Sequence, residues 1–181
     1  MGIVLTALNA PFALRRLKAA RALLSDLTPL KSDCGRLCEG ACCQPDETGL
    51  NGMLLYPHEE KLYRKTIEGF AFTLLDDDGL YKGGKRLVCE GVCPREHRPL
   101  ACRIFPLRMR VNATDDSPSV TAELDPRAWA VCPLLEEGGL RAMRSDFIKA
   151  VETAGEILCA NTEIFAALLN EQRALDEARH L

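Results

Sequence analysis

Residues 34–43 read Cys34-Gly-Arg-Leu-Cys38-Glu-Gly-Ala-Cys42-Cys43, which places four thiols within ten residues. A second group, Cys89-Glu-Gly-Val-Cys93, follows, and two single cysteines stand at positions 102 and 132. Thiolates are the natural ligands of Zn²⁺ and of iron–sulfur clusters, whereas Mg²⁺ and Ca²⁺ select oxygen ligands. We therefore predict a metal centre that holds either zinc, as one or two ions, or an iron–sulfur cluster. The predicted metal ligands are Cys34, Cys38, Cys42, Cys43, Cys89, Cys93, Cys102 and Cys132.

The cysteine count and the start of the chain predict a reducing compartment. Nine cysteines cannot all pair in disulfides. The apolar opening from Met1 to Leu8 lacks the basic residues of a secretory signal, and Asn9 and Pro11 interrupt it. We therefore expect the protein in the cytoplasm, where clustered thiols more often hold metal or do redox chemistry. The isolated Cys159 is better interpreted as a small buried apolar residue.

The number of metal sites stays open at this point. A tetrahedral zinc ion takes four ligands, so eight cysteines satisfy two zinc sites, or one iron–sulfur cluster with thiols left over. Gly35, Gly40 and Gly91 lie inside the cysteine groups, where they allow the sharp backbone turns that aim several thiolates at one point. The side chains of Cys42 and Cys43 would diverge on an extended backbone. This predicts that the pair serves two sites, or two metals of one cluster.

Apolar periodicity predicts helices at both ends of the chain around an irregular centre. Residues 12–28 alternate apolar and basic positions with helical spacing, which predicts an amphipathic helix closed by Pro29. Residues 107–111 and 120–124 alternate with the period of a strand around the polar segment NATDDSPS, which predicts an antiparallel hairpin. The other predicted elements are helices over 57–69, 138–159 and 162–179, the last capped by Asn161 or Thr162, and a strand over 70–75.

The predicted fold is therefore mainly α with a small antiparallel β-hairpin. In this predicted fold, an irregular cysteine-rich, metal-bound centre packs between the N- and C-terminal helices. A chain of 181 residues can bury one sizeable core, so we predict a single domain over 1–181. Within it, the metal-binding centre covers 33–133 and a C-terminal helical segment covers 138–181.

Charge and hydropathy restrict the partners. The 26 acidic and 23 basic residues give a net charge of −3, which makes nucleic acid an unlikely partner. No apolar run approaches the ~20 residues that span a bilayer, so no membrane partner is expected. The predicted partner is the metal ion, and the sequence does not identify a protein partner or substrate.

Two sets of arginines carry predictions of their own. Arg95, Arg98 and Arg103 surround the second cysteine group, where they are candidates to neutralise a thiolate centre and to donate hydrogen bonds to sulfur. The alternative is that they are solvated surface charges. Arg108 and Arg110 share one face of the predicted strand, and this face is either a binding patch or a solvent face.

The segment Arg98-Pro-Leu-Ala-Cys102-Arg-Ile-Phe-Pro106, together with the two cysteine groups, resembles the YkgJ-type CxxCxxCC family of zinc- or iron-chelating proteins. The resemblance runs from Cys34 to Cys132 and excludes the flanking helices. The first group has three residues between its cysteines where the family has two, which leaves the individual ligands there open. The resemblance implies metal binding. Some relatives are linked to the N-methylation of flagellin lysines, so it also implies an enzymatic role by analogy.

Three functions follow from these observations. The first is a metal-binding cysteine-cluster protein, with a structural centre or a role in handling metals or clusters. The second is a metal-dependent protein-modifying enzyme such as a lysine N-methylase. The third is a zinc-stabilised nucleic-acid-binding module that uses the basic stretch 95–110, and the acidic net charge and the lack of interleaved aromatic residues weaken it.

Overall fold

The computed structural model describes residues 2–32, 34–36, 38–44, 52–90, 93–112 and 118–178. Its α-helices are α1 (Gly2–Leu23), α2 (Leu100–Ile104), α3 (Ser145–Cys159) and α4 (Thr162–Ala178). Its strands are β1 (Met53–Leu54), β2 (Phe72–Asp76), β3 (Lys85–Cys89), β4 (Leu107–Asn112) and β5 (Ser119–Leu124). Short 3₁₀-helices cover Cys34–Arg36, Ala41–Cys43, Glu59–Tyr63, Arg95–His97, Pro126–Ala130, Pro133–Leu135 and Gly139–Ala142.

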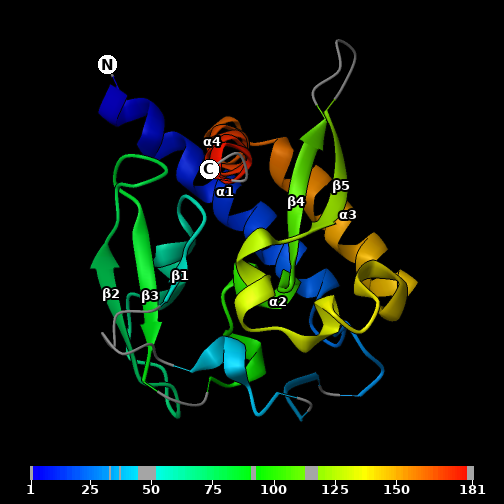
Figure 1. Ribbon diagram of the computed structural model, residues 1–181. Coiled ribbons are helices and arrows are strands. Elements are labelled where there is room, and N and C mark those ends of the chain that lie inside the picture. Colours follow the sequence, from blue (N-terminus) through cyan, green and yellow to red (C-terminus); the bar gives the residue numbers. More distant parts are fainter. Residues whose placement is uncertain are drawn as a thin grey trace.

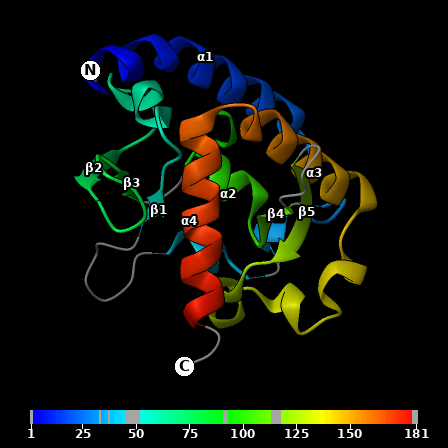
Figure 2. The same cartoon turned by 90° about the horizontal axis from the view of Figure 1, so that it is seen from above.

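Two small antiparallel sheets lie on opposite sides of α4 (Figures 1 and 2). One sheet has the strand order β1-β3-β2, and the other is the β4–β5 hairpin. Helices α1 and α3 lie side by side, and α3 packs against the hairpin (Figure 2). None of the helices that the structure describes is both long and apolar enough to cross a membrane.

The main core forms where α1, α3 and the hairpin meet. Helix α1 contributes Ala13, Leu17 and Ala20, which have the spacing of one helical stripe, and Leu24 directly after the helix extends this face. All four residues are fully buried. The facing residues are Phe147, Val151, Ala154 and Leu158 of α3 and Leu107, Met109, Val111, Val120 and Ala122 of the hairpin. Phe12 and Leu23 are apolar residues of the segment predicted as an amphipathic helix. They do not contribute to this core, because their side chains are 65% and 39% exposed.

Helix α1 begins and ends earlier than the predicted 12–28. It starts at Gly2 and continues through Pro11, whose missing N–H removes one internal hydrogen bond. It ends at Leu23, where the bond from Leu24 N to Arg21 O (3.2 Å) tightens the last turn. Residues 24–28 therefore lie outside the helix.

The predicted hairpin is confirmed. Its register runs from the pair Leu107–Leu124 to the pair Asn112–Ser119, and residues 113–117 of its loop lie outside the described part of the chain. The predicted strand over 70–75 is β2, shifted to 72–76. Its partner β3 and the two-residue β1 were not predicted.

The predicted helix over 57–69 is wrong. Only a 3₁₀-helix over Glu59–Tyr63 forms there. His58 directly before it has a left-handed φ of 72°, and Ile67 and Phe70 pair in an isolated β-bridge. Both conformations exclude a continuous α-helix.

At the C-terminal end, the last predicted helix is confirmed as α4; residue 179 lies outside the described residues. The Asn161 side chain caps it, because Oδ1 accepts hydrogen bonds from the N–H groups of Glu163 (3.2 Å) and Ile164 (3.1 Å). The helix predicted over 138–159 starts only at Ser145. Gly138 and Gly139 have φ values of 127° and 58°, which break the helix at its predicted start.

The contact between α3 and β5 gives a first testable prediction. Gly155 of α3 is buried, and a Cβ atom added there would lie 2.5 Å from Cγ1 of Val120. Overpacking of a core costs about 1–3 kcal/mol, and the better helix propensity of alanine offsets about 1 kcal/mol. We expect Gly155→Ala to lower the free energy of unfolding in urea titrations by up to about 2 kcal/mol. The clash should be relieved in the Gly155→Ala/Val120→Ala double variant, so a double-mutant cycle without coupling would contradict this packing.

Candidate metal centre

Cysteines from both groups line one small cavity. Cys42 and Cys43 belong to the 3₁₀-helix Ala41–Cys43, and Cys89 is the last residue of β3. Cys93 follows shortly after, and Cys102 lies in α2. The five side chains line a cavity of about 80 Å³. The structure thus brings together two stretches of chain that are far apart in the sequence.

The first cysteine group turns back on itself through two left-handed residues. Glu39 and Gly40 have φ values of 50° and 70°, and the N–H of Gly40 bonds to the carbonyl of Gly35 (3.0 Å). The 3₁₀-helix that follows keeps the Sγ atoms of Cys42 and Cys43 only 3.9 Å apart. The prediction that the two side chains diverge is therefore wrong, because the backbone there is helical instead of extended. The third glycine of the predicted turns, at position 91, lies outside the described residues.

A buried carboxylate positions the helix that carries Cys102. Glu59 is fully buried, and its Oε1 accepts hydrogen bonds from the Leu100 N–H (2.8 Å) and from Nη1 of Arg21 (3.0 Å). Its Oε2 accepts a bond from the Tyr56 N–H (3.2 Å). Glu59 therefore links α1 to the first turn of α2. The sequence contains no signal for this role, because Arg21 and Leu100 are 38 and 41 residues away from Glu59 in the chain.

The thiols of the cavity differ in pKa. The interaction between the side chains of Cys89 and Cys93 lowers the pKa of Cys89 and raises that of Cys93. The positive charge of Arg98 adds to the lowering at Cys89. Burial raises the pKa of Cys102, and the nearby Cys43 and Cys89 add to this rise. Of Cys89, Cys93 and Cys102, Cys89 therefore most readily supplies a thiolate, which is the form that binds metal.

Arg98 is the arginine that faces the sulfurs. It lines the cysteine cavity, and its Nε is buried with no hydrogen-bond acceptor among the described residues. A buried donor without an acceptor is unusual in a folded protein. A negatively charged thiolate centre in the cavity would provide both an acceptor and a counter-charge for it. The donor set and this arginine therefore fit a thiolate-bound metal.

Arg95 and Arg103 donate their hydrogen bonds to backbone carbonyls and not to the sulfurs, so this part of the sequence prediction is wrong. Arg95 donates through Nε to the carbonyl of Ser25 (2.7 Å) and through Nη2 to that of Leu27 (2.5 Å). Arg103 donates through Nη1 to the carbonyl of Arg21 (3.2 Å). Both guanidinium groups thus satisfy carbonyls at and just beyond the C-terminal end of α1, where the helix dipole favours positive charge.

The remaining predicted ligands lie outside the cavity. Cys34 and Cys132 pack against the main core. The charge of Cys38 contributes to a raised pKa at Cys132, where burial is the larger cause, so Cys38 and Cys132 are neighbours. Cys159 of α3 also packs against the core, where burial raises its pKa to about 11, as expected for a buried apolar residue. Over the ranges that the structure describes, no three His, Cys, Asp or Glu side chains form a ready-made set of metal ligands.

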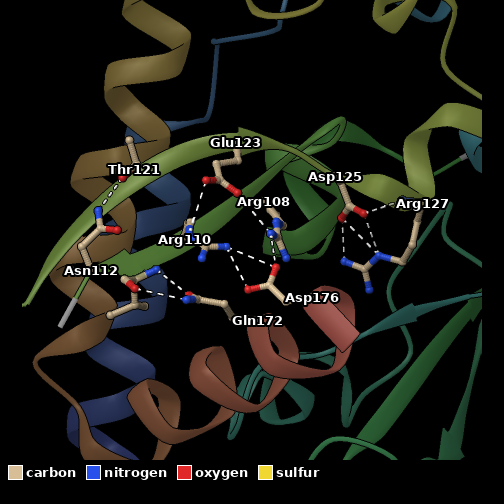
Figure 3. Close-up of polar contacts among 10 residues, drawn as sticks. Arg108, Arg110, Asn112, Thr121, Glu123, Asp125, Arg127, Gln172 and Asp176 are labelled. Atoms are coloured by element: carbon tan, nitrogen blue, oxygen red, sulfur yellow. Dashed lines mark hydrogen bonds and ion pairs between the residues drawn. The ribbon is translucent and has the colours of Figure 1, made fainter. Parts of the chain in front are cut away.

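A larger cavity of about 490 Å³ adjoins the cysteine cavity, and Cys42, Gly52 and Met53 line both. Arg108 lines it, which corrects the solvent-face interpretation of Arg108 and Arg110. Both side chains instead pair with the acidic residues Glu123 and Asp176 between the hairpin and α4 (Figure 3). The hydrogen bond from Arg108 is the largest of the effects that lower the pKa of Asp176.

Comparison with known proteins adds no relative. The sequence matches no family model and no curated protein, and the fold matches no solved structure. The resemblance to the YkgJ-type family therefore stays a prediction, and the function has to be argued from the residues of this chain.

Proposed function

We propose that this chain is a metal-binding protein that holds zinc or an iron–sulfur cluster between its two cysteine groups. The observation that carries the proposal is the cavity lined by five cysteines and by Arg98. Four thiolates complete a tetrahedral zinc site or ligate one cluster, so these five cysteines are sufficient for one centre. Cys34, Cys38 and Cys132 are the candidates for a second site.

The side chains that line the cavity favour a metal that prefers thiolate ligands. Among the described residues that line it, the polar side chains beside the thiols are Arg98 and Gln44, and none is a carboxylate. Hard cations such as Mg²⁺ and Ca²⁺ prefer several oxygen ligands, of which these side chains supply only the amide oxygen of Gln44. When bound, a zinc ion would cross-link the two cysteine groups, and an iron–sulfur cluster would add the capacity to transfer an electron. In both cases Cys89 and Cys93 would contribute two thiolates from the β3 side, and Arg98 would balance their charge.

Metal analysis of protein purified without oxygen tests this proposal. We expect about one to two zinc ions per chain in a colourless protein, or iron with acid-labile sulfide and a broad visible absorption. Elemental analysis, sulfide determination and an absorption spectrum on one sample separate the two metals. A folded protein that contains neither zinc nor iron, and that takes up neither from solution under reducing conditions, would contradict the proposal.

A further inference from the structure

Arg108 of β4 has buried donors for which the described residues provide no side-chain or carbonyl acceptor. Its side chain is only 3% exposed, and Nη2 donates to Oε2 of Glu123 (3.1 Å) and to Oδ1 of Asp176 (2.8 Å) (Figure 3). Its Nε and Nη1 are buried and have no acceptor within the described part of the chain. Since Nε carries one N–H bond and Nη1 carries two, three of the five donors of this guanidinium are unmatched. Such donors are costly in a folded protein unless a ligand or water accepts from them.

The other arginines of the same cavity are satisfied. Arg86 donates through Nε (2.8 Å) and Nη2 (2.5 Å) to Oδ2 of Asp77. Arg127 donates through Nε to both carboxylate oxygens of Asp125 (2.9 and 3.1 Å), as Figure 3 shows. Among the arginines that line the cavity, Arg108 is therefore the one whose buried donors are unmatched within the described residues.

The cavity has the size and walls of a small-molecule site. Its volume of about 490 Å³ lies within the range of about 300–1,000 Å³ that is typical of ligand pockets. Apolar side chains form much of the wall, and the charged side chains that interrupt them include Arg86, Arg108 and Arg127 together with Asp77, Asp125 and Glu171. The apolar wall residues include Leu54, Leu80, Ile104, Phe105, Leu107 and Val131.

We propose that this cavity binds a small organic carboxylate, which pairs with the guanidinium group of Arg108. A carboxylate is a charge-assisted acceptor for guanidinium, and the apolar walls fit a hydrocarbon or aromatic body. A phosphate suits the site less well. Glu123 and Asp176 already face Arg108, so a second negative charge on the ligand would add repulsion. The proposal goes beyond metal binding, because it rests on Arg108 and the cavity alone.

Titration of benzoate and hexanoate into the full-length protein, as purified, tests the proposal by calorimetry and ligand-observed NMR. Benzyl alcohol and phenyl phosphate serve as the neutral and the dianionic comparison for benzoate. We expect at least one of the two carboxylates to bind, benzyl alcohol to bind more weakly than benzoate, and phenyl phosphate not to exceed benzoate. The metal content of each preparation is measured in parallel, so failure of the metal proposal is recorded separately.

Two lysine variants provide the matched pair. Arg108→Lys keeps a positive charge near Glu123 and Asp176 but removes Nε and Nη1 as donors. Arg110→Lys changes the neighbouring arginine, which bonds to Asp176 (3.0 Å) but does not line the cavity. We expect about tenfold or greater loss of carboxylate affinity in Arg108→Lys and little loss in Arg110→Lys. Circular dichroism and the Tm confirm that both variants are folded.

Three results would overturn the assignment. The first is that neither carboxylate binds to the wild-type protein, in which case ordered water satisfies Arg108. The second is that a folded Arg108→Lys variant binds benzoate as tightly as the wild-type protein does. The third is that phenyl phosphate or benzyl alcohol binds more tightly than benzoate, because the site would then not select a carboxylate.

Discussion

The Cys102→Ser variant is expected to lose most of its bound metal, whereas Cys159→Ser is expected to keep it. Cys102 lies in α2, lines the cysteine cavity and is held in place through the bond from Leu100 to Glu59. A serine hydroxyl is a poor substitute for a thiolate toward zinc or iron. Loss of an outer partner of a metal site already costs about 10–100-fold in metal affinity, so loss of a ligand should cost at least about 100-fold.

The two serine variants separate the loss of a cysteine in the cavity from the loss of a cysteine elsewhere. Both replace one sulfur with one oxygen, but Cys159 of α3 packs against the main core and does not line the cysteine cavity. Metal content per chain is measured after dialysis against a competing chelator, and the melting temperature is measured before and after. Because metal binding to such a site contributes to folding free energy, the Tm of Cys102→Ser should also fall toward that of the metal-free protein. Full metal retention in Cys102→Ser, or equal loss in both variants, would exclude Cys102 as a ligand.

The Arg21→Met variant is expected to be destabilised by about 3–5 kcal/mol, which is the cost of leaving a buried charge without its partner. Arg21 and the fully buried Glu59 form an ion pair of 3.0 Å, and Arg21 also donates to the Tyr63 hydroxyl (2.9 Å). Urea unfolding at neutral pH measures the loss. The control is Arg144→Met, which breaks an exposed pair with Asp146 and should change the free energy of unfolding little.

The pH dependence of Arg21→Met identifies Glu59 as the origin of the loss. Burial already raises the pKa of Glu59 in the folded protein, and the charge of Arg21 opposes that rise. Without Arg21 the folded-state pKa should rise further above the unfolded value. The variant is therefore expected to be most stable below the ordinary pKa of a glutamate and to lose stability as the pH rises through the folded-state pKa of Glu59.

Unfolding curves from about pH 4 to about pH 8 measure this trend. The double variant Arg21→Met/Glu59→Gln lacks the titrating group, so it should lose the added pH dependence and recover part of the stability. An Arg21→Met variant whose deficit is constant over this range would show that lost packing, and not the stranded carboxylate, causes the destabilisation.

The sequence predicted those features whose signal is local. The alternation in 107–111 and 120–124 predicted the hairpin, and Asn161 before an apolar periodic segment predicted the cap of α4. The metal centre predicted from the clustered thiols stays a prediction, although five of its eight predicted ligands line one cavity. In each case the residues that carry the pattern are close neighbours in the chain or share one rare chemistry.

The features that were missed depend on partners far away in the chain. Arg95 and Arg103 were assigned to the sulfurs because they neighbour cysteines in sequence, but their acceptors lie about 70 to 82 residues away in and after α1. Strand β3 was not predicted because the segment Lys85–Cys89 is short, does not alternate polar and apolar residues, and follows two glycines. Gly138 and Gly139, by contrast, stood in the sequence as a local signal against the long helix predicted over 138–159.

The two arginines that bond to the carbonyls at the end of α1 have a consequence for local opening of the molecule. Arg95 and Arg103 lie in the segment that carries Cys93 and Cys102. If this segment detaches, their hydrogen bonds to the end of α1 break, although about 70 residues of chain separate the two regions. Opening of that segment should therefore fray the last turn of α1 as well. In hydrogen-exchange experiments the amides of both regions should lose protection together, as one cooperative unit, while the amides of the β4–β5 hairpin exchange more slowly.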